Sequence, residues 1–84
     1  MYYVYVLKSN AKGRHYIGHT ESITERLRKH NGGLVRATKY GKPWSCIYTE
    51  EFLTRADACK REREIKKYKG GILFKKLLGL WKDI

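Results

Sequence analysis

Tyr16, Arg26 and His30 have the side chains and the spacing that hydrolysis of a phosphodiester needs. Tyr16 offers a phenol, Arg26 a fixed positive charge and His30 a ring that titrates near neutrality. Because residues four apart lie on one face of a helix, the Arg26 and His30 side chains would project together and touch one phosphate. These residues predict phosphodiester chemistry where the segment Tyr16-Ile17-Gly18 leads into a helix.

A first strand is predicted over residues 2–8, which are β-branched and aromatic and alternate with a period of two. Val4 and Val6 fall on one side of this strand. The opposite side takes Tyr3, Tyr5 and Leu7.

A β-hairpin is expected next, because residues 9–14 are rich in turn formers and residues 15–18 resume an extended pattern. If Ile17 faces the core together with the two valines, Tyr5 and Tyr16 lie on the other face. Two phenols would then stand side by side on one surface of the sheet.

A helix should begin after Ser22, because Ser22 and Glu25 form the pattern of a capping box. It should run to about Asn31, where Gly32-Gly33 supplies a left-handed exit. Its apolar stripe, next to the face that carries the arginine and the histidine, consists of Ile23 and Leu27.

Residues 32–45 are basic and irregular, which predicts a loop near a bound anion. A third strand is expected over residues 46–52. The side chains expected to contact nucleic acid, from this loop and the preceding helix, are Arg28, Lys29, Arg36, Lys39, Lys42 and Trp44.

A second helix is predicted from the capping pattern at residues 54–57 to about residue 69. Glu62 points with its apolar side, and an inward carboxylate needs a partner or a metal. Residues 72–78 predict a short amphipathic helix that covers the core, and residues 81–84 a loosely held tail. The apolar side of the second helix consists of Ala58, Ile65 and Tyr68.

Nineteen Lys and Arg against eight Asp and Glu give a formal charge of +11 over 84 residues. This excess predicts a polyanionic partner, with nucleic acid the first candidate and an anionic membrane the second. A basic surface that serves only solubility is the third interpretation. No apolar run approaches the ~20 residues of a membrane span and no signal peptide is visible, so we expect one soluble, cytoplasmic domain.

Cys46 and Cys59 lack the spacing of a disulfide framework or a zinc site, and we expect two free thiols in the core. His15 and His19 alternate away from Tyr16 along the predicted strand, and both are expected to face solvent.

The sequence resembles the GIY-YIG nuclease domains, and most closely their small stand-alone bacterial members. Tyr3-Val4-Tyr5 stands at the first motif, Tyr16-Ile17-Gly18 matches the second, and Arg26 with His30 matches the Arg-x-x-x-His helix. Glu62 resembles the metal-binding glutamate. The likeness spans residues 2–71, with the last helix at about residues 72–80.

This resemblance implies an α+β fold, a three-stranded antiparallel sheet flanked by helices, and hydrolysis of nucleic-acid backbone, DNA more than RNA, in processes such as DNA repair. Tyr5 and Tyr16 would position or deprotonate the attacking water, and Arg26 would stabilise the phosphate. His30 would assist proton transfer. Glu62 would hold a single Mg²⁺ or Mn²⁺, since a hard oxygen ligand suits these ions.

The sequence also departs from the family pattern. Tyr3 replaces the glycine of the first motif, no asparagine follows Asn31, and residues 38–40 lack the second histidine of some members. A non-catalytic module that stacks bases on Trp44 and Tyr40 is therefore the alternative interpretation. An anionic-membrane binder using residues 72–81 is the weaker third.

Overall fold

The computed structural model describes residues 1–68 and 71–79, so the predicted helix end at Lys69 and the tail at residues 81–84 lie outside the described residues. Within the described part no helix is both long and apolar enough to cross a membrane. The elements in chain order are β1 (Tyr2–Ser9), β2 (His15–Thr20), α1 (Ile23–Asn31), the 3₁₀ helix η1 (Arg36–Thr38), β3 (Trp44–Phe52), α2 (Arg55–Tyr68) and α3 (Ile72–Leu77).

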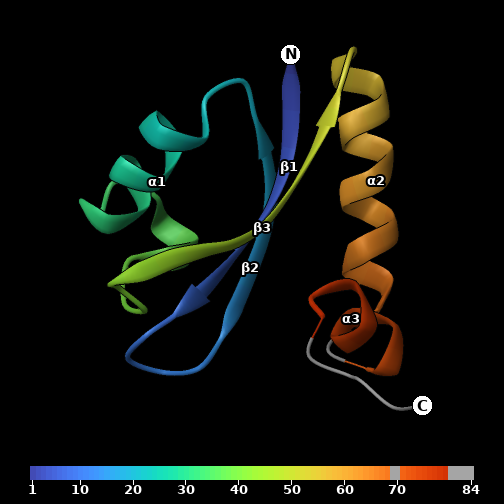
Figure 1. Ribbon diagram of the computed structural model, residues 1–84. Helices are drawn as coiled ribbons and strands as arrows, with labels where there is room; N and C mark the ends of the chain where they lie inside the picture. Colours follow the sequence, from blue (N-terminus) through green and yellow to red (C-terminus); the bar gives the residue numbers. More distant parts are fainter. Residues whose placement is uncertain (69–70, 80–84) are drawn as a thin grey trace.

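The three strands form one antiparallel sheet in the order β2-β1-β3, so the N-terminal strand lies in the middle. Figure 1 shows α1 on one side of this sheet and α2 with α3 on the other. The predicted α+β fold with a three-stranded antiparallel sheet is confirmed. The strands β2 and β3 are each two residues longer than expected.

The core on the α2 side is built from the valines of β1. Val4 and Val6 are fully buried and pack with three residues of α2 and α3, which are Ala58, Ile65 and Phe74. Ile17 packs against the same cluster, in register with Val6. The period-two prediction for β1 is therefore confirmed, and one face of the sheet supplies most of the apolar burial.

The opposite face of β1 carries Tyr5 and Leu7, which are buried together with Trp44. Tyr16 and two residues of α1, Ile23 and Leu27, cover this second cluster. The chemically interesting phenols thus lie under α1, while the bulk of the aliphatic core lies under α2.

Helix α1 is capped by Ser22, whose hydroxyl accepts a hydrogen bond from the Glu25 amide at 3.3 Å. Only this half of the predicted capping box forms, because the Glu25 carboxylate binds Arg28 at 2.6 Å instead of reaching back. The left-handed residue after the helix is Gly33, with φ 75°, whereas Gly32 keeps a right-handed conformation.

Candidate active site

The Tyr5 hydroxyl is the centre of a hydrogen-bond network under α1. It lies 2.9 Å from His30 Nε2, and the Arg26 Nε–H donates to it at 3.3 Å. β1 fixes the phenol and α1 supplies both partners, which stand four residues apart as the sequence predicts. A phenol, a guanidinium and an imidazole are therefore in direct contact.

The Thr38 hydroxyl determines which ring nitrogen of His30 donates a hydrogen bond and which one accepts. The Thr38 hydroxyl donates to the Val35 carbonyl at 3.3 Å, so it accepts from His30 Nδ1 at 2.7 Å. Nε2 of a neutral His30 is then the acceptor for the Tyr5 O–H. The network consequently presents a proton-accepting nitrogen to the phenol.

His30 is 0% exposed, which corrects the expectation that it touches a phosphate together with Arg26. Both ring nitrogens are occupied by Tyr5 and Thr38, and no surface of the ring remains for a ligand. Any effect of His30 on chemistry must pass through the Tyr5 hydroxyl.

Burial has the largest effect on the pKa values of Tyr5 and His30. It raises the pKa of Tyr5 to about 12, because desolvation outweighs the hydrogen bond from Arg26. Burial, with the nearby Arg26 charge, lowers the pKa of His30 to about 4. Both groups are therefore neutral at pH 7, because the hydrogen bond and charge of Arg26 lower the pKa of Tyr5 by less than burial raises it. The Arg26 pKa is raised, chiefly by its hydrogen bond to Tyr5.

Tyr16 stands beside the network, as the hairpin predicts. Its ring centroid lies 6.3 Å from that of Tyr5 and 4.8 Å from that of His30. Gly18 makes this arrangement possible, since a Cβ there would meet the Tyr5 hydroxyl at 2.7 Å and the Tyr16 ring at 3.2 Å. The glycine of the Tyr16-Ile17-Gly18 segment is therefore required for close approach of two phenols.

Glu62 points inward from α2 as expected, with its side chain 16% exposed, and it has two partners. His19 Nδ1 lies 2.6 Å from its Oε1, and Lys66 Nζ lies 2.6 Å from its Oε2. Burial raises the pKa of Glu62, but the hydrogen bonds from Lys66 and His19 more than offset it, so the net pKa is lowered. The carboxylate is ionised and held in place.

His19 corrects a prediction, because it is half-buried and bonded to Glu62, not solvent-facing. His15 is exposed as expected, although its ring also packs edge-on against Phe74, with 5.1 Å between the ring centroids.

Both cysteines are free and half-buried. The Sγ of Cys59 lies 3.5 Å from His19 Nε2, and Cys46 packs under α1. Among the described residues no group of three His, Cys, Asp or Glu side chains is arranged to hold a metal by itself.

Glu62 lies on the α2 side of the sheet and the phenols lie on the α1 side. Both sides are connected through neighbouring residues of β2. His19, which binds Glu62, follows directly after Gly18, over which the Tyr5 hydroxyl lies. In addition to burial and the Tyr16 phenol, which raise the pKa of Tyr5, the Glu62 charge is close enough to raise it in the same direction. Glu62, through His19, and Tyr5, through Gly18, therefore both contact one short stretch of β2.

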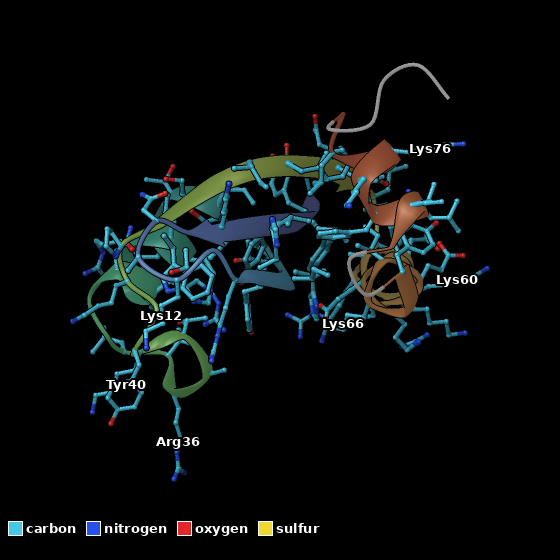
Figure 2. All side chains as sticks on the ribbon, turned by 90° about the horizontal axis from the view of Figure 1, so that it is seen from below. Lys12, Arg36, Tyr40, Lys60, Lys66 and Lys76 are labelled. Carbon is cyan, nitrogen blue, oxygen red and sulfur yellow. The ribbon has the colours of Figure 1, made fainter. Side chains whose placement is uncertain are left out.

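The residues expected to contact nucleic acid differ in how accessible they are to a ligand. Trp44 corrects its prediction, since it is buried and its indole N–H donates to the Thr38 carbonyl at 2.9 Å, leaving no face for a base. Arg28 is exposed but paired with Glu25. Figure 2 shows Arg36 and Tyr40 pointing away from the sheet. Lys39 and Lys42 are exposed on the same loop, and Lys29 is half-buried beside Arg26.

The GIY-YIG catalytic domain family matches residues 1–75 of this chain. This protein belongs to the GIY-YIG family. It is 38% identical over 68 residues to a UPF0213 protein of Staphylococcus epidermidis, covering 80% of this chain and 82% of that protein. A UPF0213 protein of Staphylococcus saprophyticus matches at 38% over the same shares of the chains, and one of Staphylococcus aureus at 37%.

No solved structure matches this GIY-YIG protein. Membership in the family supports a nuclease-type activity in general, and it implies a nucleic-acid substrate and dependence on a divalent metal. The relatives' names state no activity.

The residues present fit a divalent ion of the Mg²⁺ class. Such an ion is held by one or two carboxylates, waters and substrate phosphates, and not by a full set of protein ligands. Glu62 supplies an ionised carboxylate, and Lys66, whose side chain is 55% exposed, occupies one of its oxygens and can swing out to solvent. A metal at Glu62 would take the place of the lysine ammonium.

Four residues of this neighbourhood were missed from the sequence: His19, Thr38, Cys59 and Lys66. A signal existed for His19, since the alternation that places Ile17 against the core also places His19 on that side. Lys66 stands four residues after Glu62, a common ion-pair spacing on helices. Thr38 carries no such signal, because its contact with His30 depends on the course of a loop.

Proposed function

We propose that this protein is a metal-dependent endonuclease that hydrolyses phosphodiester bonds of DNA, with Tyr5, Tyr16, Arg26, His30 and Glu62 at its active site. The observation that carries the proposal is the Tyr5 hydroxyl, held 2.9 Å from His30 and 3.3 Å from Arg26 beside the Tyr16 ring. A buried phenol with a proton acceptor on one side and a fixed cation on the other is suited to orient a water for attack on phosphorus.

In this mechanism Tyr5 and Tyr16 hydrogen-bond the attacking water and set its direction. Arg26, half-buried and charged at all accessible pH values, stabilises the negative charge that develops on the phosphate oxygens. His30 holds the Tyr5 proton in a defined direction and accepts it if the phenol deprotonates the water. In the free protein this transfer is strongly unfavourable, given pKa values of about 12 and about 4, so Tyr5 acts first as an orienting group.

A Mg²⁺ or Mn²⁺ ion, one per active site, would supply positive charge that lowers the pKa of the attacking water and of the phenols and neutralises the phosphate. Glu62 is the residue proposed to hold it. His19 fixes the orientation of that carboxylate from the other side, as the outer partners of metal ligands commonly do.

The test is cleavage of plasmid and branched DNA with Mg²⁺, comparing wild type with Tyr16→Phe and Glu62→Gln. We expect each substitution to lower the rate at least ~100-fold, because each removes a group that acts directly on the reacting atoms. Lys60→Ala is the matched control, since Lys60 projects from the outer side of α2 (Figure 2). Equal cleavage by all four proteins would refute the assignment.

The preference for DNA, the cytoplasmic location and a role in DNA repair belong to the same proposal. The formal charge of +11 supports a nucleic-acid partner, and two free cysteines suit a reducing compartment. Cleavage of an RNA strand of the same sequence under the same conditions, at the same rate, would overturn the preference for DNA.

A second candidate function is binding without cleavage. It is favoured by the loop around Tyr40, which is 79% exposed and has the Lys39 ammonium 5.6 Å from its ring centroid. Such a module predicts salt-sensitive binding and no product at any metal concentration. The plasmid assay distinguishes the two functions directly.

A further inference from the structure

A pocket of about 330 Å³ opens beside the candidate active site, lined by residues from the start of β1, the end of β2 and the start of α2. Figure 1 shows that these three segments lie at the same end of the sheet. Its wall includes Arg26, which also donates to the Tyr5 hydroxyl. One side chain thus connects the pocket with the phenols. The volume lies within the range of sites that bind small ligands.

Three cations line this pocket, and two of them lie on one face of α1. Arg26 and Lys29 are three residues apart on that helix, and Arg55 faces them from the start of α2. Lys29 forms no ion pair within residues 1–68 and 71–79. An anion in the pocket would meet both a guanidinium and an ammonium.

The two acidic side chains on the wall do not cancel these cations. The Glu25 carboxylate is turned to Arg28 at 2.6 Å, and the pKa of Glu25 is lowered by that hydrogen bond. Glu21 reaches Arg55 only at 3.9 Å, with both side chains 65% exposed. Arg55 is therefore held loosely enough to take another partner.

Arg55 also lies over an aromatic ring. Its Cζ is 5.7 Å from the centroid of Tyr2, which is half-buried at the start of β1 and is itself part of the pocket wall. The Arg55 side chain is 65% exposed, so its guanidinium remains accessible to a ligand although the Tyr2 ring lies beneath it. A planar guanidinium presented in this way is a surface on which a nucleobase stacks.

We propose that this pocket binds one unpaired nucleotide next to the bond that is cut, with Arg26 and Lys29 on its phosphate and Arg55, backed by Tyr2, stacked on its base. A base inside a duplex is stacked on its neighbours and cannot enter, so the substrate class is nucleic acid with a single-stranded segment, such as a flap or an open end. This inference rests on the proposed function and names its substrate.

The experiment measures binding in EDTA, so that no cleavage is needed. A fluorescein-labelled single strand and the same strand annealed to its complement are titrated with wild type, Arg55→Ala, Arg55→Lys and the control Lys60→Ala. Circular dichroism checks that each variant is folded. Arg55→Lys keeps the charge and removes the planar stacking surface.

We expect Arg55→Ala and Arg55→Lys each to weaken binding of the single strand about five- to tenfold, the loss of one stacked base, and to change duplex binding by less than about twofold. Lys60→Ala should weaken both forms to the same small extent. Wild-type affinity in Arg55→Lys, or equal losses on both forms in Arg55→Ala, would overturn the inference. Failure of the proposed function would appear separately, as no cleavage of any DNA with Mg²⁺ while this selectivity persists.

Discussion

His19 Nδ1 lies 2.6 Å from Glu62 Oε1, so the carboxylate proposed to bind metal is fixed from β2. Its second oxygen is held by Lys66 from one turn farther along α2. These contacts couple the sheet to α2 at the site. A metal bound at Glu62, as proposed, would have to compete with this lysine.

Removal of that lysine should strengthen metal binding. In Lys66→Ala the ion pair between Glu62 and the partly exposed Lys66 is lost, and its about 0.2–1 kcal/mol no longer opposes the metal. This predicts a half-maximal Mg²⁺ concentration about 1.5- to fivefold lower. Titration of cleavage rate against Mg²⁺ measures it, and Mn²⁺ binding followed by electron spin resonance checks it without turnover. Lys67→Ala on the same helix is the control, and an unchanged midpoint in Lys66→Ala would contradict the competition.

Tyr5→Phe should remove activity while the protein stays folded. The substitution keeps the buried ring and deletes the oxygen shared by His30 and Arg26, leaving His30 Nε2 without a partner at a cost of about 1–3 kcal/mol in stability. We expect cleavage to fall at least ~100-fold in the plasmid assay. Tyr40→Phe, at an exposed ring, should match wild type in both rate and stability. If Tyr5→Phe cleaves like wild type, the phenol has no role in the reaction.

Gly18→Ala should also lower activity while the protein stays folded, because it displaces the Tyr5 phenol without removing it. A Cβ at this position would lie 2.7 Å from the Tyr5 hydroxyl, so the phenol must move, at a cost of about 1–3 kcal/mol. Gly13→Ala is the control, because its φ of 67° also strains an alanine, by about 1–2 kcal/mol, yet nothing lies within 4 Å. Thermal melts compare the stability of the two variants. At similar stability, only Gly18→Ala should lose cleavage. Equal activity in the two variants would argue against the role of close approach.

The buried His30 predicts a fall in stability on mild acidification. Its pKa is lowered to about 4, whereas the unfolded chain titrates near 6.5, so the unfolded state binds the extra proton first as pH falls. The contribution is complete above pH 6.5 and is lost as pH falls toward 4, with a total on the order of 3 kcal/mol. Urea unfolding between pH 7 and 4.5 measures the slope, before most carboxylates titrate. His30→Gln should flatten it, and a parallel slope in that variant would assign the effect elsewhere.

The period of two in β1 was enough to predict the fold around it. Val4 and Val6 against Tyr5 and Leu7 separate two environments, and the structure places α2 and α1 on those faces as the pattern requires. The same rule predicts that His19 lies on the side of Ile17. The error over His19 came from treating a polar residue as exposed when its side of the strand was already known.

The errors around the loop have another cause. Trp44 is buried because Gly41 leaves room for its ring and the Thr38 carbonyl accepts its N–H. His30 is buried because Thr38 returns to it from eight residues away. Both contacts depend on the course of the loop between α1 and β3, which the periodicity of helices and strands does not predict. Local patterns therefore predicted which side chains come together under α1, but not which of them solvent reaches.

Tyr5 occupies the middle strand of the sheet, hydrogen-bonded along both sides. Amide protons of its neighbours should exchange with deuterium only when the whole sheet opens. Heat or urea should then abolish catalysis at the same midpoint at which the protein unfolds, with no inactive folded form in between.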